Sequence, residues 1–252
     1  MADTIVFLHA HPDDESIFTG GTIARLRAAG VRCVVVIATN GDADPWSAAA
    51  AVRVGEARAA CSVLGADAVH LLGFADSGLH VERAAPDSFW HRQEAAIGVV
   101  ADLLRTEGAT AVVVYDDNGI YGHPDHVAVH AVGVAAAEIA GVATVYESTV
   151  DREYLHFVET HLVGHAVESL LGMEVEATNT APLGVPTVLV SATVDVRDVI
   201  AAKREAMAAH ASQIAADSET LMMDTATFEG VYGYEWYTRR SGPEGPLDRL
   251  GF

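Results

Sequence analysis

The sequence predicts an α/β fold in which a Rossmann-like, mostly parallel sheet is flanked by helices and followed by a less regular C-terminal part. One observation is that short apolar runs alternate with helical patterns over residues 1–150. Such alternation is typical of right-handed crossovers between parallel strands. Another is that the 252 residues are 50% apolar and 20% charged, which suffices for a sizeable core. We therefore predict a single domain, 1–252, with a core over 1–150 and a substrate-shaping part over 151–252.

The core elements follow from the apolar runs and the residues that bound them. Five short runs are expected to be strands: Thr4–Leu8, Cys33–Ala38, Val69–Leu72, Ala111–Tyr115 and Thr144–Glu147. Four segments have helical spacing: Thr22–Ala29, Ser47–Leu64, Ser88–Glu107 and Pro124–Ala140. Gly30 and Gly65 follow the first two helices, and Pro124 opens the last, as helix ends favour. The run from Cys33 is apolar throughout, which indicates a strand buried on both faces.

The part of the chain after residue 150 has weaker patterns. Two helices are expected there: Asp151–Gly172 and Val196–Ala215. Two strands are expected as well, the second of which could instead form an aromatic wall of the substrate site: Thr187–Thr193 and Tyr232–Thr238. The Gly- and Pro-rich tail from Ser241 is expected to be mobile.

Composition restricts the partners and the compartment. The chain has 15 Lys plus Arg against 35 Asp plus Glu, a net charge of −20, so nucleic acid and membrane surfaces are not expected to bind. Cys33 and Cys61 lie in apolar patterns and are expected to be buried thiols rather than a disulfide. No basic segment with a following apolar stretch opens the chain, so a cytoplasmic location is expected. A monomer and a homo-oligomer are both compatible with this sequence.

A first chemical motif, His11-Pro-Asp-Asp-Glu15, follows the first strand, at the sheet edge where open α/β sheets bind ligands. One tight turn would place His11 and Asp14 on the same side, and an imidazole with a carboxylate suits a divalent metal such as zinc. Pro12 stiffens that turn. Asp13 would remain free to take a proton from water. The alternative is an ordinary acidic helix N-terminus.

A second motif, Tyr121-Gly-His-Pro-Asp-His126, follows the fourth strand, which is expected to lie beside the first. One of its histidines would complete a two-histidine, one-carboxylate site with an open position. The other would act as a general acid or stabilise an oxyanion, with Asp125 raising its pKa. The alternative is a pair of helix-capping histidines.

These two motifs resemble the signatures of the zinc-dependent N-acetylglucosaminyl deacetylase superfamily (PIG-L/LmbE-like). The Tyr-Gly pair before His123 resembles the branch that contains the mycothiol-pathway deacetylase and amidase. Shorter similarities extend along most of the chain: Thr39–Asp42, Arg53 with Glu56, Gly73–Gly78, Lys203 with His210–Gln213, and Gly233–Trp236.

The resemblance implies a role for each residue of the motifs. It implies three metal ligands: His11, Asp14 and His126. It makes Asp13 the general base, and His123 the group that stabilises the oxyanion and protonates the leaving amine, with Asp125 tuning it. Tyr121 would polarise the carbonyl.

The resemblance places three further residues at the substrate. Arg53 and Asp76 correspond to positions that contact the sugar or its aglycone in the family. Phe18 stands where members of the family have a small polar residue or a lysine. The aromatic ring of Phe18, on the loop after the first motif, suggests a more apolar aglycone. The cofactor implied is Zn²⁺, with Fe²⁺ or Co²⁺ as substitutes.

The function implied is hydrolysis of an N-acyl group, most simply acetyl, from a small molecule that contains N-acetylglucosamine. Three alternatives stay open at this point: an amidase for a larger acyl group or a mycothiol S-conjugate, an Fe(II)-dependent oxygenase using the same ligands, and a non-catalytic metal- or sugar-binding module. Outside the motifs, His9 is expected to be a core histidine, while His210 is open between packing and function.

Overall fold

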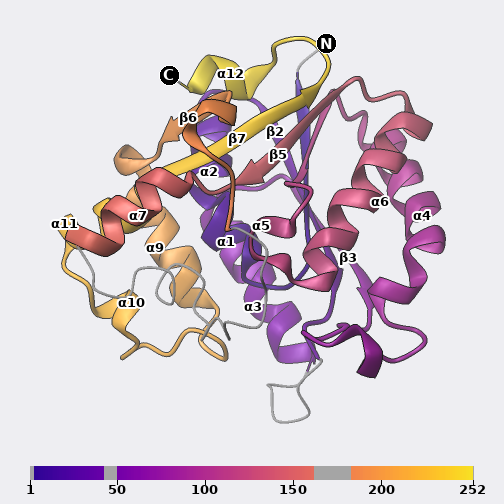
Figure 1. Ribbon diagram of the computed structural model, residues 1–252, viewed down its shortest axis with the longest axis horizontal. Coiled ribbons are helices and arrows are strands. Elements are labelled where there is room, and N and C mark those ends of the chain that lie inside the picture. Colours follow the sequence, from indigo (N-terminus) through magenta and orange to yellow (C-terminus); the bar gives the residue numbers. More distant parts are fainter. Residues whose placement is uncertain (1–2, 43–49, 162–182, 252) are drawn as a thin grey trace.

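The computed structural model describes residues 3–42, 50–161 and 183–251, which contain a seven-stranded sheet of order β3-β2-β1-β4-β5-β7-β6 (Figure 1). The strands are β1 Thr4–His9, β2 Arg32–Thr39, β3 Ala68–Phe74, β4 Ala111–Tyr115, β5 Thr144–Thr149, β6 Ala192–Asp195 and β7 Tyr234–Ser241. Strands β1 to β5 are parallel, whereas β7 is antiparallel to β5 and to β6. The expected α/β fold with a mostly parallel sheet is confirmed.

Helices cover both faces of this sheet. Within the described residues they are α1 Asp14–Phe18, α2 Gly20–Ala28, α3 Ala50–Val63, α4 Gln93–Glu107, α5 Gly119–Gly122, α6 Pro124–Ala140, α7 Arg152–His161, α9 Ile200–Ala209, α10 Glu219–Met222, α11 Thr225–Tyr232 and α12 Pro246–Leu250. Helices α4 and α6 pack together on one side, and α2, α3 and α9 pack together on the other (Figure 1). None of the helices in the described residues is long and apolar enough to cross a membrane.

Local sequence signals account for the central elements. Every side chain from Cys33 to Ala38 in β2 is fully buried, as a strand covered on both faces requires. Helix α6 opens with Pro124 at its first position and ends at Gly141, whose φ of 77° is the left-handed conformation that glycine adopts easily. Helix α6 therefore has the expected bounds, and β2 extends one residue beyond the expected strand at each end.

The order of the strands brings the two motifs together. Strand β1 lies between β2 and β4, and its Ile5, Val6 and Phe7 pair with Ala111, Val112 and Val113 of β4. The loops that follow β1 and β4 therefore leave the sheet at neighbouring carboxyl ends, which confirms the expected position of the fourth strand beside the first.

The C-terminal elements differ from the expected ones. Thr187–Leu189 is a turn of 3₁₀ helix, and the strand begins only at Ala192, where pairing with Tyr237 of β7 starts. The helix expected over Val196–Ala215 is α9, which ends one residue before His210, and Tyr232 closes helix α11 instead of opening a strand. The pairing of β6 with β7 decides where this strand begins, and the apolar pattern of the sequence contains no information about that pairing.

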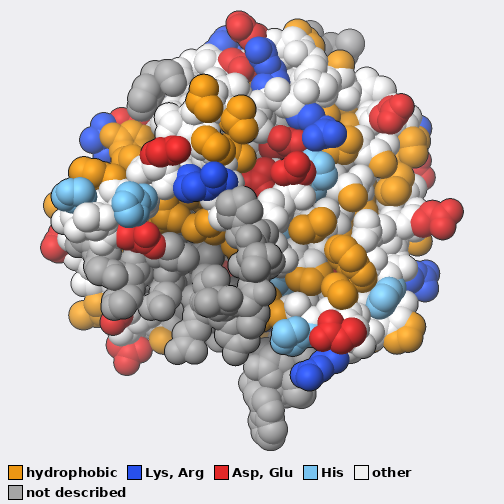
Figure 2. Space-filling view, viewed as in Figure 1, with side chains coloured by type: hydrophobic (Ala, Val, Ile, Leu, Met, Phe, Trp, Pro, Cys, Tyr) orange, Lys and Arg blue, Asp and Glu red, His pale blue; other side chains and the backbone are white. Residues whose placement is uncertain are grey.

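The tail from Ser241 contains helix α12, which packs on β6. The expectation of a mobile tail is wrong, because α12 lies in it and Leu247 is fully buried. Helix α7 forms the described part of the helix expected from Asp151, while residues 162–172 lie outside the described residues, as does Ser47 at the expected start of α3. The face drawn in Figure 2 carries several acidic side chains near its centre, in keeping with the net charge of −20.

Candidate metal and catalytic site

The loops after β1 and β4 bring two imidazoles and one carboxylate to a single point. Asp14 Oδ2 lies 3.3 Å from His11 Nδ1 and 3.3 Å from His126 Nε2, and all three side chains are buried. Ligand atoms bound to one tetrahedral zinc at about 2.0–2.2 Å stand about 3.3–3.6 Å apart. The three residues named by the first and second motifs therefore fit a divalent metal ion in chemistry and in spacing.

A third imidazole, that of His123, lies beside this group. Nitrogens of His11, His123 and His126 lie within 4.8 Å of one another. His123 is the N-cap of α6, and its Nδ1 accepts a hydrogen bond of 3.1 Å from the backbone N–H of Asp125. Because Nδ1 is an acceptor, the ring proton of neutral His123 is on Nε2, from which it can donate to a substrate oxygen.

The protonation expected for His123 is not supported by its surroundings. Burial, and after it the neighbouring His11 and His126, lower the pKa of His123 well below its ordinary value. This shift favours the neutral form of the imidazole. A neutral imidazole can still stabilise an oxyanion as a hydrogen-bond donor.

The expected contact between the Asp125 carboxylate and His123 is wrong. In the described part of the chain, Asp125 Oδ2 accepts from the backbone N–H of Ser77 (2.9 Å) and lies 3.3 Å from His11 Nε2, and Oδ1 accepts from the Ser77 hydroxyl (2.5 Å). The reason is that Asp125 is fully buried on the opening turn of α6, where its side chain faces the loop after β3. The carboxylate of Asp125 thus touches a predicted metal ligand, whereas the predicted acid is met by the backbone N–H of Asp125.

Asp13 occupies a strained position next to the ligands. Its φ of 127° is unusual for a residue with a Cβ, and the other non-glycine residue with positive φ in the described chain, Ile120, lies in the loop after β4. Burial, followed by the charge of Asp14, raises the pKa of Asp13 to about 7. A carboxylate with a pKa near the working pH is well suited to accept and return a proton.

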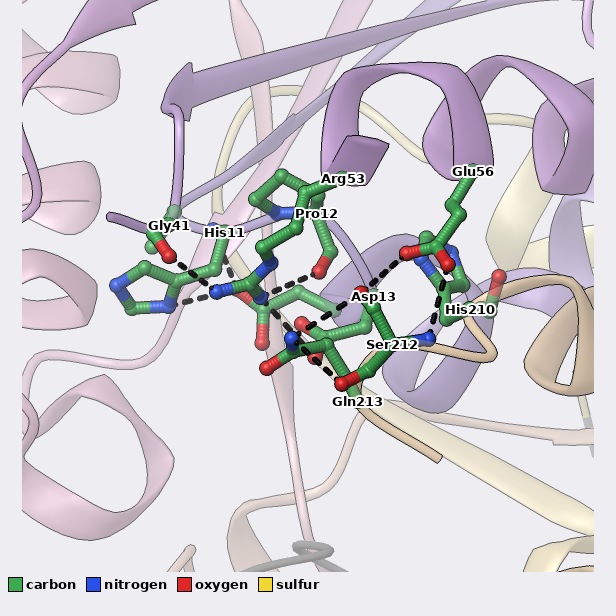
Figure 3. Close-up of polar contacts among 12 residues, drawn as sticks. His11, Pro12, Asp13, Gly41, Arg53, Glu56, His210, Ser212 and Gln213 are labelled. Atoms are coloured by element: carbon green, nitrogen blue, oxygen red, sulfur yellow. Dashed lines mark hydrogen bonds and ion pairs between the residues drawn. The ribbon is translucent and has the colours of Figure 1, made fainter. Parts of the chain in front are cut away.

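Two neighbours hold Asp13 in this position. Its backbone N–H donates to Glu15 Oε2 (3.0 Å), and its Oδ2 lies 3.3 Å from Arg53 Nη2. The same guanidinium donates to the carbonyls of Gly41 and Pro12, so it ties together the loops after β1 and β2 (Figure 3). Arg53 is 7% exposed, and its contacts place it at the site, whereas its expected contact with the sugar stays a prediction.

The other predicted site residues surround the metal ligands. Asp76, in the loop after β3, places Oδ2 3.5 Å from His11 Nε2, and the Tyr121 hydroxyl lies 3.4 Å from His126 Nε2. Phe18 ends helix α1 instead of lying in a loop, and its buried ring meets Tyr115 and His126 edge-on. This packing accounts for an aromatic residue there, so Phe18 no longer indicates an apolar aglycone, and its substrate contact stays a prediction.

Three residues of this region were missed by the motif analysis: Tyr115, Glu15 as a partner of His210, and Ser77. The Tyr115 ring stacks on His126 at 4.3 Å, and its hydroxyl lies 3.0 Å from His9 Nδ1. His9 also meets Thr19, so it is a core histidine as expected. A hydroxyl at the carboxyl end of a buried strand is the signal that could have identified Tyr115.

Glu15 and His210 form a fully buried pair. His210 Nε2 lies 2.6 Å from Glu15 Oε1. Burial alone would lower the pKa of His210, but Glu15 outweighs it and the pKa is raised. Ser212 continues from His210 and binds Glu56 of α3 through its N–H (2.8 Å) and its hydroxyl (2.5 Å) (Figure 3). The chain after α9 is thereby fixed against the first motif.

Comparison with known proteins identifies the family. The sequence model of the family described as PIG-L, GlcNAc-PI de-N-acetylase, matches residues 6–137, just over half of the chain. The chain belongs to this family. The PIG-L match includes both motifs and confirms the resemblance on which the ligand assignment was based.

Curated relatives carry the name of one enzyme. The 1D-myo-inositol 2-acetamido-2-deoxy-alpha-D-glucopyranoside deacetylase of Thermobispora bispora is 32% identical, and the alignment covers 98% of this chain and 91% of the relative. The enzyme of the same name from Salinispora arenicola is 35% identical over 96% of this chain and 86% of its own. These PIG-L relatives agree with the branch that the Tyr-Gly pair before His123 indicates.

Solved structures show the same fold at low identity. The N,N'-diacetylchitobiose deacetylase of Pyrococcus horikoshii has a TM-score of 0.60 at 20% identity, covering 95% of this chain and 84% of that one. GalB, a 4-carboxy-2-hydroxymuconate hydratase of Pseudomonas putida, also reaches 0.60 at 15% identity, covering 97% and 98%. The fold is therefore not confined to deacetylases. The oxygenase alternative receives no support from the PIG-L family or these relatives.

Proposed function

We propose that this protein is a zinc-dependent hydrolase that removes the N-acetyl group from a small molecule containing N-acetylglucosamine. The observation that carries the proposal is the convergence of His11, Asp14 and His126 at 3.3 Å spacings beside Asp13. A metal ion held there supplies Lewis acidity and makes water a better nucleophile near neutral pH. A metal held by three protein ligands would keep a position for water.

The chain's own residues account for the proton transfers and for the charge that develops. Asp13, with a pKa of about 7, takes the proton from the attacking water. The Nε2–H of His123 and the hydroxyl of Tyr121 donate to the oxyanion that forms from the amide carbonyl. Asp13 is then protonated and can return this proton to the departing nitrogen, while the lowered pKa of His123 favours its role as a hydrogen-bond donor to the oxyanion.

The substrate class is suggested by the relatives. Two of them are named for deacetylation of an inositol-linked 2-acetamido sugar, and the alignments cover nearly all of this chain. Arg53 of helix α3 lies beside Asp13, and Asp76 of the loop after β3 lies beside His11, so a sugar hydroxyl would find charged partners there. The buried thiols of Cys33 and Cys61 suit the reducing cytoplasm, where we expect the enzyme to work.

The proposal is tested by hydrolysis of a panel of N-acetylated amino sugars that includes 1D-myo-inositol 2-acetamido-2-deoxy-α-D-glucopyranoside. Release of acetate and of a primary amine is measured anaerobically, before and after treatment with a chelator. We expect both products to appear, chelation to reduce them to background, and Zn²⁺, Fe²⁺ or Co²⁺ to restore them. Activity that survives removal of the metal would refute the proposal.

A pair of variants locates the metal. Asp14→Ala removes the carboxylate between the two imidazoles and should abolish metal binding. Asp117→Ala changes an exposed carboxylate of the loop after β4 and should leave it intact. Cleavage of longer N-acyl chains in preference to acetyl would instead identify the protein as an amidase.

A further inference from the structure

We infer that Ser77 positions the metal ligand His11 through the buried carboxylate of Asp125, and so sets the affinity of the site for its metal. This inference rests on the metal site of the proposed function. It assigns a role to Ser77, and it gives Asp125 a role different from the one that the motif suggests.

The two nitrogens of His11 face different groups. Nδ1 lies 3.3 Å from Asp14 Oδ2, on the side shared with His126. Nε2 lies 3.3 Å from Oδ2 of Asp125, which is fully buried, and 3.5 Å from Oδ2 of Asp76. When Nδ1 binds a metal, the ring proton is on Nε2 and is donated towards these two carboxylates, of which Asp125 is the nearer. A carboxylate placed there fixes the tautomer and the rotation of the ring, and increases the basicity of the ligating nitrogen.

Asp125 is itself held at both oxygens. Oδ2 accepts from the Ser77 N–H at 2.9 Å, and Oδ1 accepts from the Ser77 hydroxyl at 2.5 Å. The hydroxyl in turn accepts from the backbone N–H of Trp90 at 2.9 Å, so its own proton is directed at Asp125. Asp125 is 0% exposed, which means that water does not take the place of these donors. The orientation of the carboxylate therefore depends on Ser77.

The other imidazole ligand is oriented in a different way. His126 stacks on Tyr115 at 4.3 Å with an interplanar angle of 15°, and its Nδ1 is buried without a hydrogen-bond partner in the described residues. Packing positions His126, whereas hydrogen bonding positions His11. Loss of the Ser77 contact should consequently affect one ligand and spare the other.

The test measures zinc affinity directly, by competition with a chromogenic chelator, on the full chain. Substitution of the hydrogen-bond partner of a ligand costs about 10–100-fold in affinity, and Ser77→Ala, which acts through that partner, should weaken zinc binding by an amount near the lower end of this range. Ser77→Thr keeps the hydroxyl and should restore most of the affinity. Ser88→Ala is the matched control, because Ser88 is a buried serine of the same loop whose hydroxyl has no partner in the described residues. This variant should bind zinc like the parent chain.

The outcomes separate this inference from the proposed function. If the unsubstituted chain binds no zinc, the proposed function fails. If it binds zinc and Ser77→Ala binds equally tightly, only the positioning role fails. Asp125→Asn provides a second variant of the same shape and should also lose at least about 10-fold. Undiminished affinity in that variant would overturn the inference as well.

An alternative to the positioning role of Asp125 is that Asp125 itself binds the metal. His11, Asp76 and Asp125 form a second group of potential metal ligands in the described chain. If that group held the zinc, Asp76→Ala would abolish binding while Asp14→Ala would retain it, and Asp125 would be a ligand instead of a positioning residue. We expect the opposite order, with binding lost in Asp14→Ala and largely kept in Asp76→Ala.

Discussion

Two features of Asp13 are unfavourable for the folded chain: its backbone conformation and the ionised form of its carboxylate. Its backbone has a φ of 127°, and its carboxylate is largely enclosed, with the side chain 18% exposed, beside the negatively charged Asp14. A proton acceptor must be ionised, yet burial favours its protonated form and raises its pKa to about 7. The local structure therefore favours function at the expense of stability, as often occurs at active sites.

Asp13→Asn should lower turnover and raise stability together. Removal of the base should reduce turnover about 10²–10⁴-fold. At pH 8, without metal, the variant should gain about 1–3 kcal/mol in free energy of unfolding, because it no longer has a buried carboxylate to ionise. The pKa is higher in the folded than in the unfolded chain, so this difference grows as pH rises through about 4 to 7 and vanishes below it.

Urea unfolding of the parent chain and of Asp13→Asn at pH 8 and at pH 4.5, both with a chelator, measures this difference. A variant that is less stable than the parent chain at pH 8 would show that the carboxylate is not destabilised by its surroundings.

Single elements could be predicted from the sequence wherever they carry their own signals. Helix α6 has proline at its start and glycine after its end, and β4 is an isolated apolar run, and both have the predicted bounds. Strand β6 has no such signals, and its pairing with β7 decides where it begins.

The three metal ligands were found because short motifs contain them. The contact of Asp125 with Ser77 spans 48 residues and that of Glu15 with His210 spans 195, so spacing could not reveal either.

Helix α5 depends on one glycine to fit against α6. Gly119 has a φ of 63°, and a Cβ there would lie 2.6 Å from the Cβ of His126 and 2.7 Å from the backbone nitrogen of Val127. Gly108, after α4, has a φ of 65° but open space around it. Alanine at either position costs about 1–2 kcal/mol for the left-handed backbone. Only at position 119 does it also push on a metal ligand.

Gly119→Ala should therefore weaken zinc binding, whereas Gly108→Ala should lose stability alone. Unfolding curves of the apo variants measure the shared backbone effect, and chelator competition measures the difference between them. Equal zinc affinities in both variants would mean that the close packing of α5 does not fix His126.

At the scale of the whole molecule, a buried ion pair of the C-terminal part contacts helix α2, which follows the first motif. Lys203 of α9 lies 2.7 Å from Glu235 of β7, and both side chains are 1% exposed. Glu235 also accepts from the backbone N–H groups of Gly21 and Thr22, at the start of α2, each at 2.8 Å. These two contacts span 214 and 213 residues of the chain, and they hold the helix that directly follows α1, which carries Asp14.

The two partners of this pair should respond unequally to substitution. Without Lys203, the Glu235 carboxylate keeps two backbone donors, the Tyr237 hydroxyl at 3.3 Å and the positive end of α2. Without Glu235, the Lys203 ammonium has no carboxylate partner among the described residues and is left buried. Breaking a buried pair at one side costs about 3–5 kcal/mol, and we expect Glu235→Gln to lie at the upper end and Lys203→Met below it.

Arg249→Met provides the control, because it breaks an exposed pair with Asp3 and should cost about 0–1 kcal/mol. Chemical denaturation ranks the three variants. Zinc affinity should fall with Glu235→Gln, because α2 loses one of the two acceptors and the negative charge at its first turn, and stay unchanged with Arg249→Met. A Lys203→Met variant less stable than Glu235→Gln would mean that the lysine, and not the end of α2, is what keeps the carboxylate in place.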